Sequence, residues 1–167
     1  MMRKALKMVL ITTAIISPIA QAQWLTQTED DLFSDGKKAA MIGETSSDNS
    51  AIIFNCTKNT LTAAYVEMDK THESTAKMPM ELVMKVDGNN ALKFNATLSR
   101  RNVQSLEIAT NDAEQLKILL KQLKEAKSQV LVGAQTEDGG SKFSLSANVS
   151  GSTSAVNKFV AACEIKL

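Results

Sequence analysis

The sequence predicts a mainly β fold, an antiparallel β-sandwich or partly closed barrel of about eight strands with two helices. Apolar and polar residues alternate strictly over residues 92–99 and 142–149. A period of two is typical of a strand that has one buried face. The segments 87–90 and 137–140 are rich in Asp, Asn, Glu and Gly and lie between such runs, as tight hairpin turns do. Successive strands joined in this way are antiparallel.

Seven further runs have the composition or the alternation of strands. Between two of the early ones, Glu44 to Ser50 has the polar composition of a loop. A second polar loop is expected from Asp69 to Lys77. The seven runs are Trp24 to Thr28, Lys38 to Gly43, Ala51 to Asn55, Leu61 to Met68, Met80 to Val86, Val103 to Ala109 and Gln129 to Thr136.

Two segments have the helical period instead. A mid-chain helix over residues 112–127 has leucines on one face and lysines on the other, with Asn111 expected as its N-cap. A C-terminal helix over residues 152–163 follows Gly151 and places its apolar side chains on one stripe with Cys163. We therefore expect Cys163 to face the core.

Residues 1–22 have the pattern of a cleaved signal peptide. A basic start precedes an apolar stretch over residues 8–20 that is too short to span a bilayer, and Ala20-Gln21-Ala22 is a small-x-small cleavage site. We expect export to the periplasm with cleavage after Ala22, which leaves residues 23–167 as a single domain. No later apolar run approaches the length of about 20 residues that a membrane helix needs, so no stable membrane insertion is expected.

The charge of the mature chain argues against a nucleic-acid partner. Three of the 19 Lys and Arg residues, and none of the 18 Asp and Glu residues, lie in the first 22 positions. The remaining chain therefore has a formal net charge of −2. A nucleic-acid-binding surface normally shows a clear excess of basic residues.

The two cysteines, Cys56 and Cys163, predict a structural disulfide. An even, isolated pair in an exported chain is expected to be oxidised. A redox or zinc site is less favoured, because the pair lacks a C-x-x-C spacing and further ligands. The disulfide would close a large loop, so we expect it to stabilise the fold substantially.

No residue pattern predicts catalysis, a metal site or a cofactor. His72 is the only histidine and lies in the polar loop of residues 69–77, with nothing nearby that resembles a nucleophile elbow. Four methionines near it raise the alternative of a Cu(I) site. However, Met80 and Met84 share one strand face with other apolar residues, which favours packing in the core.

The order of the elements resembles that of the periplasmic type VI secretion-associated family, and more loosely that of the invasion-associated locus B family. The resemblance rests on Trp24 followed by Asp30-Asp31, on the two strands of residues 52–65 around Cys56, and on the ending of residues 116–163. Asn55 and Glu164 depart from the arginine and the aromatic residue that the first family usually has beside its two cysteines.

Membership of that family implies a non-catalytic periplasmic accessory protein of envelope protein secretion, which acts by binding a protein or cell-wall partner. The alternative hypothesis is a periplasmic inhibitor or immunity protein that inserts a loop into the cleft of a lysozyme-type hydrolase. In both cases we expect loops to bind the partner. The candidate binding residues are Asp69, Lys70, His72 and Glu73; the oligomeric state is left open.

Overall fold

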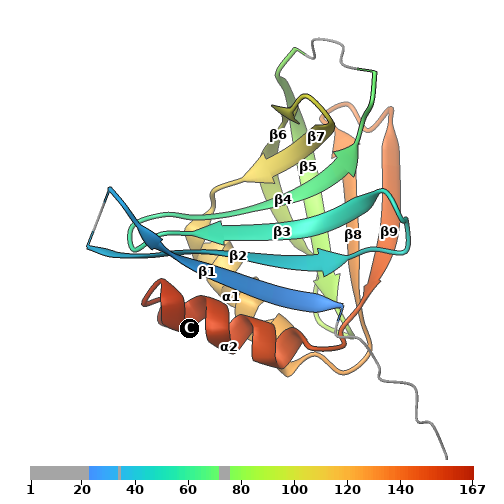
Figure 1. Ribbon diagram of the computed structural model, residues 1–167. Coiled ribbons are helices and arrows are strands. Elements are labelled where there is room, and N and C mark those ends of the chain that lie inside the picture. Colours follow the sequence, from blue (N-terminus) through green and yellow to red (C-terminus); the bar gives the residue numbers. More distant parts are fainter. Residues whose placement is uncertain (1–22, 34, 72–75) are drawn as a thin grey trace, which may run out of the picture.

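The computed structural model describes residues 23–33, 35–71 and 76–167, so the predicted signal peptide, Ser34, His72 and Glu73 lie outside the described part. Nine strands and two helices follow one another along it (Figure 1). The strands are β1 (Trp24–Asp31), β2 (Gly36–Glu44), β3 (Ser50–Cys56), β4 (Leu61–Met68), β5 (Met78–Val86), β6 (Leu92–Asn102), β7 (Ser105–Thr110), β8 (Gln129–Thr136) and β9 (Lys142–Asn148). The helices are α1 (Ala113–Glu125) and α2 (Ser152–Ala162).

All nine strands belong to one antiparallel sheet, in the order β1-β2-β3-β4-β7-β6-β5-β8-β9. The sheet curls into a half-barrel, which confirms the predicted mainly β class and its partly closed form. The turns at 87–90 and 137–140 join antiparallel neighbours, β5 to β6 and β8 to β9, as predicted. By contrast, β4 pairs with β7 and β5 pairs with β8, so two of the contacts join strands that are distant in sequence.

The two edges of the sheet meet at one end of the half-barrel. The backbone N–H of Trp24 donates to the carbonyl of Ser150 at 3.1 Å, and its indole N–H donates to the carbonyl of Asn148 at 2.6 Å. An isolated bridge joins Thr45 to Ala147 close by. The start of β1 and the end of β2 are therefore tied to β9, whereas the other ends of β1 and β2 carry a hairpin turn away from the body (Figure 1).

The two helices pack on each other and cover the inner face of the sheet, with α2 along β1 and β2. The predicted N-cap of α1 was wrong by one residue. Asp112 is the cap, because its carboxylate accepts the backbone N–H of Gln115 at 3.2 Å. Helix α2 starts after Gly151, whose φ of 82° lies in the left-handed region that glycine adopts at little cost.

The core lies between the inner sheet face and the helices. Its largest fully buried side chains include Trp24, Phe54 and Phe159, and the four leucines predicted on one face of α1 are buried there. Met80 and Met84 are buried too, which confirms that they pack in the core. These side chains remove apolar surface from water, which is the main favourable term in folding.

The predicted disulfide is confirmed. Cys56 at the end of β3 is bonded to Cys163 at the end of α2, with their Cα atoms 6.1 Å apart. Cys163 faces the core, as its helical stripe predicted, and both cysteines are buried. The bond therefore fastens the last helix to β3, the third strand from one edge of the sheet.

One carboxylate joins two turns at the end of β5. Asp87 accepts the backbone N–H groups of Lys127, Ser128 and Gln129 at 2.7, 2.9 and 2.9 Å. These bonds hold the pKa of the Asp87 carboxyl below its usual value, and the bond from Gln129 has the largest effect. Asp87 itself adopts a φ of 50°, so the left-handed conformation of this turn belongs to the aspartate rather than to Gly88.

Candidate functional site

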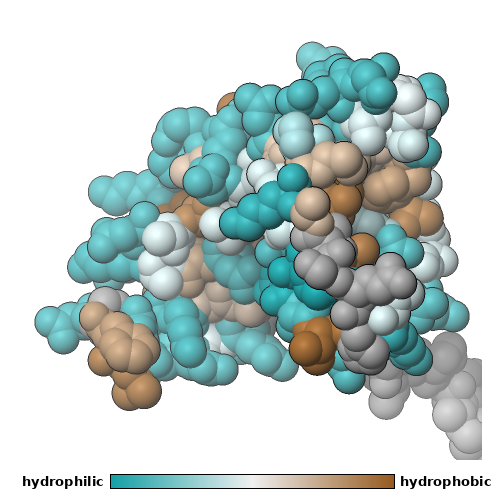
Figure 2. Space-filling model, turned by 90° about the horizontal axis from the view of Figure 1, so that it is seen from above, coloured by the Kyte–Doolittle hydropathy of each residue, from teal (hydrophilic) through white to brown (hydrophobic). Residues whose placement is uncertain are grey.

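The turn between β1 and β2 exposes two neighbouring large apolar side chains. Leu32 is 92% exposed and Phe33 is 97% exposed. The backbone N–H of Phe33 donates to the Asp31 carboxylate at 3.1 Å, which shapes the turn locally. Figure 2 shows an apolar patch at the left margin, where this hairpin ends in Figure 1, next to hydrophilic surface. A single exposed leucine is ordinary, but two adjacent apolar side chains on a projecting turn indicate a contact site.

The base of this hairpin is held firmly. Helix α2 packs against both β1 and β2. The hydroxyl of Thr26 in β1 donates to the carbonyl of Ala155 in α2 at 2.8 Å, in a buried position. The disulfide fixes the far end of the same helix to β3. The turn is therefore presented from a fixed scaffold, as binding loops usually are.

The turn is acidic as well as apolar. Asp30, Asp31 and Asp35 flank the two apolar residues, and no Lys or Arg occurs between residues 30 and 35. Further down the hairpin, Lys38 forms an ion pair with Glu29 at 3.1 Å. We call Asp30, Asp31, Leu32, Phe33 and Asp35 the hairpin tip.

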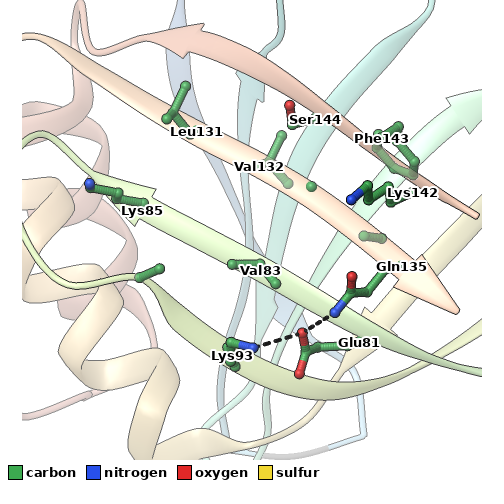
Figure 3. Close-up of a pocket in the computed structure, with 13 residues that line it drawn as sticks. Glu81, Val83, Lys85, Lys93, Leu131, Val132, Gln135, Lys142, Phe143 and Ser144 are labelled. Carbon is green, nitrogen blue, oxygen red and sulfur yellow. Dashed lines mark hydrogen bonds and ion pairs between the residues drawn. The ribbon is translucent and has the colours of Figure 1, made fainter. Parts of the chain in front are cut away.

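A second feature is a hollow of about 530 Å³ on the outer face of β5, β6, β8 and β9. Its apolar wall includes Val83 and Leu131, and three lysines surround it (Figure 3). Lys85 and Lys142 lie at opposite ends, and neither has an ion-pair partner among the described residues. We call this site the lysine hollow; the three lysines are Lys85, Lys93 and Lys142.

Two local contacts shape the lysine hollow. The Glu81 carboxylate accepts hydrogen bonds from the Lys93 ammonium group at 3.2 Å and from the Gln135 side-chain amide at 2.7 Å (Figure 3). These contacts close one side of the hollow. Gly133 lies in the lining, and a Cβ atom there would come within 2.6 Å of the Phe143 carbonyl oxygen. Glycine is therefore required by the close approach of β9, and it also leaves this strand position without a side chain in the hollow.

The loop predicted to bind a partner is described only in part. Asp69 forms an ion pair with Arg100 and accepts the backbone N–H of Thr71 at 2.9 Å. These contacts lower the pKa of Asp69 to about 2; the bond from Thr71 has the largest effect and the bond from Arg100 the second largest. Lys70 is exposed, while His72 and Glu73 lie outside the described residues. The structure thus gives Asp69 a local structural contact and leaves Lys70 open to solvent.

The other polar loop, Glu44 to Ser50, helps to close the half-barrel. The backbone N–H of Ser46 donates to the carbonyl of Ser146 in β9 at 2.6 Å. The hydroxyls of Thr45 and Ser50 are 2.6 Å apart and share a hydrogen bond. This loop is therefore part of the contact between the two sheet edges.

The described residues contain no group of three or more His, Cys, Asp or Glu side chains that could hold a metal ion. Within the same residues, no helix is long and apolar enough to cross a membrane. Neither the hairpin tip nor the lysine hollow was predicted from the sequence. Leu32-Phe33 inside an otherwise acidic turn is a signal that would have indicated the tip, since turns are normally polar.

Comparisons of the chain with models of protein families, with curated proteins and with solved structures find no match.

Proposed function

We propose that this protein is an exported, non-catalytic binding protein of the periplasm that serves envelope protein secretion as an accessory. The hairpin tip is its main contact with a protein partner. The observation that carries this proposal is the exposure of Leu32 and Phe33, 92% and 97%, on a turn whose base is held by α2. Because α2 holds the base of the turn, the backbone that carries these side chains loses little conformational freedom on binding, which favours affinity.

The disulfide supports the proposed compartment. A bond between Cys56 and Cys163 persists in oxidising environments such as the periplasm and is rare in the cytosol. It agrees with the signal peptide expected over residues 1–22. The link to a type VI secretion apparatus rests on the resemblance in sequence order, which is an analogy.

The shape of the tip also favours a second function, the inhibition of a lysozyme-type hydrolase. A projecting turn that carries an apolar pair between acidic side chains suits insertion into an enzyme cleft. The two functions differ in the partner, which is a secretion component in the first case and a wall hydrolase in the second. The loop of residues 69–77, with Lys70 exposed, is the alternative contact site in both.

The test is a pull-down from an envelope extract with the mature protein as bait and mass spectrometry of the captured proteins. We expect Leu32→Ser/Phe33→Ser to lose the partner. The matched control is Leu25→Ser/Ile118→Ser, because these residues are 62% and 50% exposed and lie outside the turn. Capture that survives the tip variant but is lost when residues 69–77 are replaced by a Gly/Ser linker would assign binding to that loop instead.

A hydrolase assay separates the two functions. A captured component of the secretion apparatus supports the accessory role. A captured wall hydrolase whose activity falls on addition of the mature protein, and not of the tip variant, supports the inhibitor role. Loss of capture in the surface control as well would mean that neither proposal describes the contact.

A further inference from the structure

The hairpin tip and the lysine hollow are complementary in charge and in hydropathy. The tip places Leu32 and Phe33 between three aspartates. The hollow surrounds an apolar wall with three lysines and a single glutamate, Glu81, so its lining has an excess of two positive charges. This excess is local, because the mature chain as a whole is slightly acidic. Opposite charges around an apolar centre are typical of protein interfaces.

The two sites lie on opposite sides of the molecule. The tip ends the β1–β2 hairpin at the left of Figure 1, and the hollow lies over β5, β8 and β9 at the right. Because α2 and the edge contacts of Trp24 hold the hairpin base, the tip is not placed to reach the hollow of its own chain. Any contact between the two sites must join two copies.

We infer that this protein associates with itself head to tail, with the hairpin tip of one copy seated in the lysine hollow of the next. Leu32 and Phe33 contact the wall around Val83 and Leu131. Asp30 and Asp35 face the ammonium groups of Lys85 and Lys142. The contact uses different surfaces on its two sides, so it extends into chains or closes into a ring, depending on the rotation between copies.

This association goes beyond the proposed function and competes with it for the tip. A tip seated in a hollow is not free to bind another partner, so partner binding is favoured at low protein concentration. One tip in one hollow is smaller than a standard interface of about 1,600 Å², and the association is therefore weak and concentration-dependent.

Charge reversal on each side provides the test. The tip-reversed variant is Asp30→Lys/Asp35→Lys; Asp31 is kept because it accepts the N–H of Phe33. The hollow-reversed variant is Lys85→Glu/Lys142→Glu; Lys93 is kept because it pairs with Glu81. Each variant then has two sites of like charge and repels itself. A mixture of the two variants restores opposite charges at every contact.

Sedimentation velocity on the mature protein measures the outcome up to about 1 mM. We expect the weight-average mass of the wild type to rise with protein concentration. Its association should weaken at least about tenfold as the ionic strength rises from about 0.01 M to about 1 M, because the Debye length falls from about 30 Å to about 3 Å and the charges of the two sites are then screened. Each variant alone should associate at least about tenfold more weakly, and the mixture should return to the wild-type behaviour. Circular dichroism checks each fold, and Lys142→Glu alone replaces the double variant if that does not fold.

Three results would each overturn the inference: a wild-type protein that stays monomeric throughout, variants that associate alone as the wild type does, or a mixture no more associated than its components. None of these results affects the test of partner capture. That pull-down uses dilute bait, at which self-association is weak, and it compares the wild-type tip with Leu32→Ser/Phe33→Ser.

Discussion

The two ends of the β1–β2 hairpin present apolar side chains in opposite ways. At the end where the two sheet edges meet, which we call the closed end, Trp24 is buried and lies opposite Gly43 in the register. It is hydrogen-bonded to Asn148 at the end of β9 and to Ser150 just after it. At the other end, Leu32 and Phe33 have almost no contact with the rest of the protein. The same hairpin thus carries one aromatic residue that closes the fold and another, in its turn, that is exposed to solvent.

The difference comes from tertiary contacts and not from local sequence. Trp24 meets the other sheet edge and fits across Gly43, where any side chain would collide with the indole. Leu32 and Phe33 lie beyond the last residue of β1, where neither α2 nor another strand covers them. An apolar residue is buried only where the topology brings a second surface to it.

The largest expected effect removes the disulfide that holds α2 on the sheet. Cys56→Ser/Cys163→Ser opens a loop with a sequence separation of 107 residues. The chain-entropy model then predicts a loss of about 4–5 kcal/mol from the free energy of unfolding, because the unfolded chain gains freedom. Urea unfolding of the oxidised wild type and of the double variant measures this loss. A loss below about 1 kcal/mol would mean that packing alone holds α2 on the sheet.

The next effect removes the aromatic residue of the closed end. We expect Trp24→Ala to lower the free energy of unfolding by about 3–5 kcal/mol, because the variant leaves a cavity and an unpaired carbonyl at Asn148. Leu25→Ala is the matched control. Its side chain is next along β1 but 62% exposed, so its effect should stay within about 0.5 kcal/mol. Equal losses in the two variants would contradict the contrast between the two faces of β1.

The sequence predicted the parts of the fold that depend on local periodicity. The alternating strands, the leucine face of α1 and the stripe that carries Cys163 follow from residue spacing, and all are confirmed. The N-cap was misplaced because Asn111 and Asp112 are both good caps, and only the backbone geometry decides between them. The pairing of β4 with β7 and of β5 with β8 joins distant segments, which periodicity does not report.

The candidate sites were harder to predict for the same reason. The lysine hollow forms only because β5, β8 and β9 lie side by side. The need for glycine at position 133 can be recognised only when the close approach of β9 is known. The hairpin tip could have been predicted from the sequence, because Leu32 and Phe33 interrupt an acidic turn. However, its two apolar residues lie beyond a run of strand alternation, and whether another element covers them depends on the fold.

A smaller effect tests the polar loop that was predicted to bind. The folded-state pKa of Asp69, about 2, lies below its ordinary value of 3.8. The stabilisation that this ionised carboxylate provides is therefore complete above about pH 4 and is lost as the pH falls toward 2. We expect Asp69→Asn to destabilise the protein at pH 7 and to flatten the decrease in stability between pH 4 and pH 2. Unfolding curves across this range measure it, with Asp30→Asn as the control.

The smallest expected effect concerns the exposed end of the hairpin itself. Leu32→Ser/Phe33→Ser should change the free energy of unfolding by no more than about 0.5 kcal/mol, because neither side chain is packed in the folded chain. Urea unfolding of dilute protein is the measurement, since dilution keeps the chains apart. The same variant should lose partner capture. At this end of the hairpin a substitution therefore changes binding and leaves stability nearly unchanged, whereas Trp24→Ala lowers stability. A loss above about 1 kcal/mol would show that the two side chains have packing partners within the monomer. The contrast between the two ends of β1 and β2 would then be one of degree, and the tip would have to be described as part of the fold instead of as a surface held ready for a partner.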